Sequence, residues 1–202
     1  MMRAVSQVLT YLFHPLLIPI YGTLFYFQVT PKYSPLSLQS GNILPVFILT
    51  VIIPIVSMLI LKNLGLIRSQ LMLRSEERIY PLLITVLLLL MVLLRVIPNQ
   101  YTPEVYFFFL GLVIAGTACL MITLAGSIVS LHMAGIGSLL GYMVLLSLHF
   151  EKNIVVAISL CTLCSGLIAM ARLYLRAHGR ASVLAGWLIG LFSQLLLVQF
   201  WV

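Results

Sequence analysis

The stretch Ala171-Arg-Leu-Tyr-Leu-Arg-Ala-His-Gly-Arg-Ala-Ser-Val-Leu-Ala-Gly186 joins two long apolar segments and holds three arginines and a histidine. Only 7% of the chain is charged, and polar groups near a bilayer persist mainly where they have a function. On a continuous helix Arg172 and Arg176 would be i and i+4 neighbours, so two like charges would share one face. A phosphate between the two guanidinium groups would offset their repulsion. The alternative is that the arginines are a cytoplasmic anchor and that His178 is a loop residue.

The composition places the chain in a membrane. Its 202 residues are 62% hydrophobic with a mean hydropathy of +1.19, whereas about half of a soluble domain is apolar. The net charge of +7 is spread thinly, and anionic lipid headgroups explain it without a nucleic-acid partner. All four acidic residues are glutamates. The absence of aspartate argues against a prenyl- or phosphatidyl-transferase, because such enzymes need aspartate-rich metal motifs.

Apolar runs of about 20 residues predict membrane-spanning helices. We expect an all-α, polytopic membrane bundle of six to seven transmembrane helices, because helices satisfy their own backbone hydrogen bonds in lipid. No soluble domain interrupts it, so residues 1–202 form a single integral membrane domain. The predicted spans are 8–28, 43–62, 80–98, 105–125, 134–150, 153–172 and 183–202.

Counting the crossings places four polar segments on one side of the membrane: the N-terminus, 63–79, 126–133 and 173–182. Most of the basic residues, together with His132 and His178, fall on this side. The positive-inside rule would place this side in the cytoplasm. Arginines that bind an anion would add to the same count in either orientation, so the side stays open.

The arginine- and histidine-containing stretch resembles a known signature. Arg172, five residues, His178, three residues, Ser182-Val183, two residues and Gly186 match most of the pattern Ser-Arg-x5-His-x3-Asp-Val-x2-Gly. That pattern is the third signature of the type 2 phosphatidic acid phosphatase superfamily of integral membrane lipid phosphatases. Ser182 stands where the family has aspartate. A hydroxyl can orient an imidazole but cannot stabilise its positive charge as a carboxylate does.

A second segment, Val129-Ser130-Leu131-His132, resembles the family's second signature, Pro-Ser-Gly-His. The serine and the histidine are kept. Ser130 can donate a hydrogen bond to a phosphate oxygen, and the free N–H groups at the start of the predicted fifth helix attract anions. A purely structural histidine at a helix entrance is the alternative.

A third segment resembles the first signature, Lys-x6-Arg-Pro, only in part. Arg78 is separated from Pro81 by two residues, and Leu71 stands at the lysine position. Arg74 or Arg68 could supply the missing charge. The alternative is a charged interfacial loop, in which Glu76 and Glu77 favour a helix start through the helix dipole.

The resemblance implies a metal-independent reaction without a cofactor. In this family the third-motif histidine attacks phosphorus, the second-motif histidine protonates the leaving alcohol, and basic residues hold the phosphate oxygens. The corresponding residues here are His178 as nucleophile, His132 as acid, and Arg78, Arg172, Ser130 and Arg74 as phosphate ligands. Ser182, Glu76 or Glu77 would support His178. Imidazole is a competent nucleophile and imidazolium a competent acid near neutral pH.

Two functions follow from these motifs. The first is hydrolysis of a phosphate or pyrophosphate monoester of a phospholipid or prenyl lipid, in what would be a bacterial inner membrane. The second is binding or transport of a phosphorylated lipid by a related protein that has lost hydrolysis, which Ser182 favours. The lipid and the oligomeric state stay open. We interpret His14-Pro15 as a helix kink and His149 as an interfacial residue. Cys161 and Cys164 have C-x-x-C spacing within an apolar run, and the absence of a following histidine argues against a metal or redox role.

Overall fold

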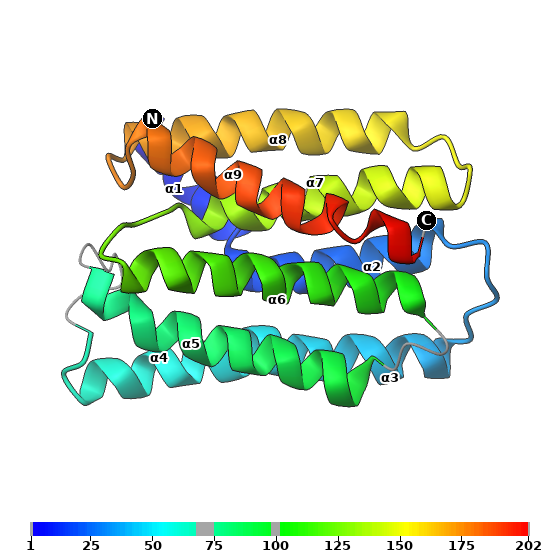
Figure 1. The fold of residues 1–202 in the computed structure, drawn as a ribbon, viewed down its shortest axis with the longest axis horizontal. Coiled ribbons are helices and arrows are strands. Elements are labelled where there is room, and N and C mark those ends of the chain that lie inside the picture. Colours follow the sequence, from blue (N-terminus) through cyan, green and yellow to red (C-terminus); the bar gives the residue numbers. More distant parts are fainter. Residues whose placement is uncertain (1, 68–74, 98–101, 202) are drawn as a thin grey trace.

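The computed structural model describes residues 2–67, 75–97 and 102–201. Within these residues it has helices and no strand, and seven helical segments are long and apolar enough to cross a membrane. Figure 1 shows these segments side by side with their long axes aligned. The predicted all-α polytopic bundle is therefore confirmed. The spans are α1 (Met2–Leu12) with α2 (Ile18–Val29), α3 (Leu36–Phe47) with α4 (Ile53–Asn63), α5 (Ser75–Met91), α6 (Pro103–Leu124), α7 (Leu131–His149), α8 (Val155–Tyr174) and α9 (Arg180–Leu195).

The first span is broken where the sequence predicts a kink. Helix α1 ends at Leu12, and a short 3-10 turn, Pro15–Leu17, connects it to α2. His14 precedes this turn, and its Nδ1 accepts a hydrogen bond from the backbone N–H of Leu16 at 3.3 Å. Proline cannot donate a backbone hydrogen bond and therefore interrupts the helix here. The kink is confirmed, and it leaves His14 at the junction of two helices.

Helix α5 begins earlier than its predicted start at residue 80. It begins at Ser75, and its first turn holds Glu76 and Glu77, as the helix dipole favours. Pro81 consequently lies inside the helix and not in its first turn, so the prediction for this proline is wrong. The carboxylates of Glu76 and Glu77 thus indicate the start of α5 better than Pro81 does.

Helix α7 is the centre of the bundle and packs most closely against α9. The window of α7 that spans the membrane is 72% buried, against 39% or less for each of the other spans. Each of the two helices carries a pair of glycines four residues apart: Gly137 and Gly141 on α7, Gly186 and Gly190 on α9. A Cβ atom on Gly190 would overlap the backbone carbonyl of Ala134. Small residues at this spacing let two membrane helices approach backbone to backbone.

The polar motifs gather at one end of the bundle. Figure 1 shows the N-terminus, the α6–α7 connection and the α8–α9 loop at the left end, together with the start of α5. The connections α2–α3 and α7–α8 lie at the opposite end. This arrangement agrees with the parity expected from counting the spans.

Candidate functional site

His178 lies in the α8–α9 loop and faces the first turn of α9. Its Nδ1 is 2.9 Å from Oγ of Ser182. Helix α9 begins at Arg180, so Ser182 is held in a regular turn while His178 precedes the helix. The hydroxyl of Ser182 therefore lies where it can orient the ring of His178.

The surroundings of His178 favour its neutral form. Burial and the positive charges of Arg172 and Arg78 lower the pKa of His178 from 6.5 to about 3. Burial is the largest cause, because a charged imidazolium loses hydration there. At neutral pH the ring is uncharged, with one nitrogen free of hydrogen, and can act as a nucleophile.

His132 lies in the first turn of α7, where it contacts the first span. Its Nε2 is 3.2 Å from the backbone carbonyl of Thr10. A carbonyl oxygen can only accept, so Nε2 carries the hydrogen and Nδ1 is left as the second functional nitrogen. The ring of His14 meets the ring of His132 edge-on, with 5.2 Å between centroids.

His14 is therefore part of the same cluster, although we interpreted it from sequence only as a kink residue. Its Nδ1 is occupied as an acceptor by the N–H of Leu16, so the neutral ring carries its hydrogen on Nε2. The charge of Arg172 acts on both His14 and His132. His14 lies 118 positions before His132, and no local spacing links the two.

Ser130 joins the second motif to the third. It precedes α7, and its backbone N–H donates to the carbonyl of Ser182 at 3.1 Å. The side chain is completely buried, and its Oγ has no hydrogen-bond partner among residues 2–67, 75–97 and 102–201. A Cβ atom on Gly186 would overlap the carbonyl of Ser130. The close packing of α7 and α9 therefore holds the two motifs together.

Two arginines complete the cluster. Arg172 in the last turn of α8 is 8% exposed, and Arg78 in α5 is 9% exposed. Their positive charges act on each other and on His178. Nε of Arg172 is buried without a partner in the described part of the chain. A buried donor without a partner is unfavourable unless a ligand accepts from it.

Arg176 does not share a helical face with Arg172, so this prediction is wrong. Helix α8 ends at Tyr174, and Arg176 adopts a left-handed backbone conformation with φ of 51°. Its side chain is exposed, whereas that of Arg172 is buried. The second buried arginine of the cluster is Arg78, whose charge acts on Arg172.

The remaining predicted residues are less closely associated with His178. Arg74 lies outside the described residues. Glu76 is exposed and Glu77 half-buried, and in the described structure neither forms a hydrogen bond or ion pair with His178. No group of three or more histidine, cysteine or acidic side chains that could hold a metal is found in the same residues.

A second polar cluster lies at the opposite end and was missed from sequence. Glu104 in the first turn of α6 is completely buried. One carboxylate oxygen accepts from Nζ of Lys32 at 2.5 Å and is 3.1 Å from Nε2 of His149. The other accepts from the hydroxyl of Tyr26 at 3.1 Å. This carboxylate links α2, α6 and the end of α7, so His149 is more than an interfacial residue.

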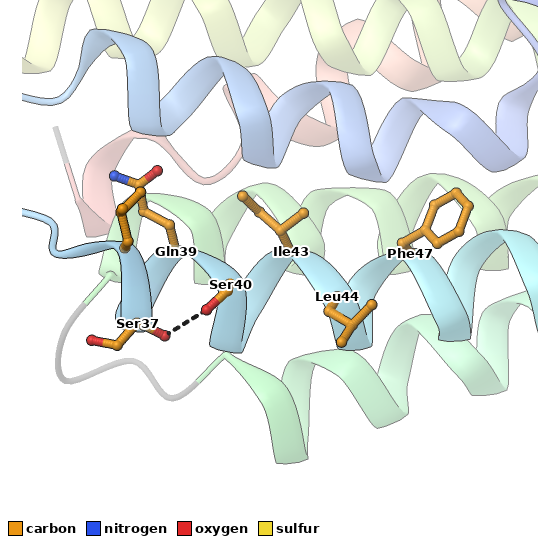
Figure 2. Close-up of a pocket in the computed structure, with 7 residues that line it drawn as sticks. Ser37, Gln39, Ser40, Ile43, Leu44 and Phe47 are labelled. Carbon is orange, nitrogen blue, oxygen red and sulfur yellow. Dashed lines mark hydrogen bonds between the residues drawn. The ribbon is translucent and has the colours of Figure 1, made fainter.

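One hollow on the surface is separate from the histidine cluster. It has a volume of about 630 Å³ and is lined by residues of α3 alone. Figure 2 shows Ser37, Gln39 and Ser40 followed along the helix by Ile43, Leu44 and Phe47. No side chain of the three motifs contributes to it.

Comparison with known proteins adds no relative. No family model matches the chain, and no curated protein or solved structure is significantly similar to it. The likeness to the type 2 phosphatidic acid phosphatases consequently depends on the three short motifs, of which the second and third are joined by backbone contact between Ser130 and Ser182.

Proposed function

We propose that this multi-pass membrane protein is a metal-independent phosphatase that hydrolyses a phosphate or pyrophosphate monoester of a lipid, in a bacterial inner membrane. The observation that carries the proposal is the position of His178: it is held by Ser182, is neutral at pH 7, and is influenced by the charges of two buried arginines. A nucleophile beside a compensating cationic pair is what phosphoryl transfer requires.

In the first step Nε2 of His178 attacks phosphorus while Nδ1 keeps its proton and donates a hydrogen bond to Oγ of Ser182. His132 enters this step as imidazolium; the bond between phosphorus and the leaving oxygen breaks, and that oxygen takes the proton from Nδ1 of His132. Nε2 of His132 stays on the carbonyl of Thr10, so Nδ1 is the nitrogen that gives and takes protons. Arg172 and Arg78 stabilise the negative charge of the transferring group.

In the second step water attacks the phosphorus of phosphohistidine. His132 takes one proton from this water, and the bond between phosphorus and His178 Nε2 breaks to release phosphate. The ring of His178 returns to its neutral form, which its low pKa of about 3 favours. His132 is again protonated for the next turnover.

Trapping the intermediate tests this proposal. Purified protein is incubated with a ³²P-labelled lipid phosphate in the presence of a metal chelator, and the reaction is quenched. The protein should then carry the label on His178. His178→Ala should abolish the label and phosphate release, whereas His132→Ala should slow release. Label that persists in His178→Ala would contradict the assignment.

A second function is favoured by one observation. Ser182 supplies a hydroxyl where a carboxylate would stabilise the phosphorylated ring, and no described carboxylate replaces it at His178. A protein with this site could bind or transport a phosphorylated lipid without hydrolysing it. Anion binding without phosphate release from any lipid phosphate would support this alternative.

A further inference from the structure

An apolar groove lies between the first span, α7 and α8. Its volume is about 350 Å³. The lining includes Leu12 and Phe13 from the first span, Ile136 and Leu139 from α7, and Cys161 and Cys164 from α8. Tyr21 also lines it, but its hydroxyl donates to the carbonyl of Leu12 at 2.9 Å. The groove therefore suits a hydrocarbon and not a polar ligand.

On two of these segments the lining leads toward the histidine cluster. On α7, Ile136 lies four residues after His132, so the two side chains share a helical face. In the first span, Phe13 immediately precedes His14. His14 and His132 are themselves in contact. Two walls of the groove thus continue into the same pair of histidines.

The third wall leads to the cationic part of the cluster. On α8, Cys164 lies eight residues before Arg172, and Cys161 lies eleven residues before it. Eleven residues are close to three whole turns of an α-helix, so Cys161 lies on the face of Arg172, and eight residues place Cys164 about 80° around the helix from that face. Arg172 acts electrostatically on His14, His132 and His178. The three walls therefore converge on one cationic, histidine-containing end.

We propose that this groove binds one hydrocarbon chain of the substrate while its phosphate lies at Arg172, His132 and His178. This inference rests on the proposed function and narrows its substrate to single-chain lipid phosphates. A water molecule occupies about 30 Å³ in the liquid, and a methylene group is of similar size. A volume of about 350 Å³ thus corresponds to about a dozen methylene groups, which is the size of one chain.

Filling the groove tests the proposal. Cys164→Trp places a large side chain in it, and Leu163→Trp is the matched control, because Leu163 is adjacent but 60% exposed and outside the lining. With Cys164→Trp, kcat/KM for dodecyl phosphate should fall at least tenfold relative to kcat/KM for butyl phosphate. Leu163→Trp should leave this ratio unchanged. An unchanged ratio in Cys164→Trp, or an equal fall in the control, would overturn the proposal.

The choice of lipid gives a second readout. A prenyl monophosphate and a lysophosphatidate each have one chain, and both should compete with dodecyl phosphate more strongly than a dioleoyl phosphatidate does. The relative strength of the first two distinguishes prenyl from acyl substrates. Stronger competition by the two-chain lipid would contradict a single-chain groove.

Cysteine protection separates this proposal from the proposed function, because it needs no hydrolysis. In protein with Cys119→Ala and Cys161→Ala, in phosphatidylcholine nanodiscs, dodecyl phosphate should slow alkylation of Cys164 at least fivefold, and dodecanol should not. Protection without phosphate release from any substrate would support the groove and reject the phosphatase. Equal protection by dodecanol, or none by either compound, would overturn the groove proposal even if hydrolysis is observed.

Discussion

Replacing Ser182 with aspartate should increase turnover. Oγ of Ser182 lies 2.9 Å from Nδ1 of His178, so a carboxylate at this position would lie beside the same nitrogen. The phosphorylated ring carries a positive charge while Nδ1 keeps its proton, and a carboxylate stabilises that charge better than a hydroxyl does. We therefore expect Ser182→Asp to accelerate formation of the phosphohistidine.

The size of the effect follows from the distance. Two unit charges about 4 Å apart interact by about 4 kcal/mol at an effective dielectric constant of about 20. Ser182 and His178 are only partly buried, so water reduces the interaction to about 1.4–3 kcal/mol. This corresponds to a gain of about tenfold to a hundredfold in kcat.

A carboxylate at position 182 should also raise the pKa of His178 without protonating its ring at neutral pH. The same interaction should raise the pKa of His178 from about 3 by about 1–2 units. Because the raised value stays well below 7, the ring is still neutral and nucleophilic at neutral pH. The gain in kcat should therefore not be offset by protonation of the nucleophile.

Phosphate release gives kcat, and an NMR titration of ¹⁵N-labelled histidine gives the pKa of His178. Ser182→Asn is the matched control, because it has nearly the shape of aspartate without the charge, and it should not raise kcat. If kcat is unchanged in Ser182→Asp although the pKa of His178 rises, charge on this ring does not limit turnover and the proposed role of Ser182 is wrong. An equal gain in Ser182→Asn would refute the electrostatic explanation.

Two further predictions test the two polar ends. Vanadate at a hundred times its Kd should stabilise the protein by about 2.7 kcal/mol, which would be measured as a rise in Tm. Arg172→Ala should abolish this rise, and the control Arg95→Ala, at the opposite end of the bundle, should keep it. An equal loss in both variants would indicate a general folding effect. Glu104→Gln should lower the free energy of unfolding by about 1–3 kcal/mol, which is less than for a fully buried ion pair because the side chain of Lys32 is 44% exposed. The exposed control Glu151→Gln should change the free energy of unfolding by less than about 0.5 kcal/mol. An equal loss in the control would contradict a special role for Glu104.

The number of spans could be predicted because it depends on composition over windows of about 20 residues, which local errors barely change. The position of a helix end depends on single residues, so the predicted helix ends were less accurate than the predicted number of spans. The i and i+4 pairing of Arg172 and Arg176 assumed that α8 continues, but this helix ends at Tyr174 and Arg176 turns into a left-handed conformation. No proline or glycine lies between Tyr174 and Arg176 to signal the end.

Contacts between distant segments could not be predicted from spacing. Glu104 is 72 residues from Lys32 and 45 from His149, so nothing local connects these three side chains. The contact of His14 with His132 is hidden in the same way. By contrast, the two glycine pairs of α7 and α9 are visible in the sequence. Their four-residue spacing indicates close helix packing, and this signal could have placed the second and third motifs together in advance.

The two polar ends differ in how many of their buried polar atoms find partners among the described residues. At one end the buried carboxylate of Glu104 accepts from Lys32 and Tyr26 and contacts His149, so its charge is neutralised within the protein and its role is to tie helices together. At the other end the buried atoms Arg172 Nε and Ser130 Oγ have no partner among the described residues. Buried polar groups left in this way are costly unless something binds them. This imbalance is why we assign ligand binding to the histidine end and a structural role to Glu104.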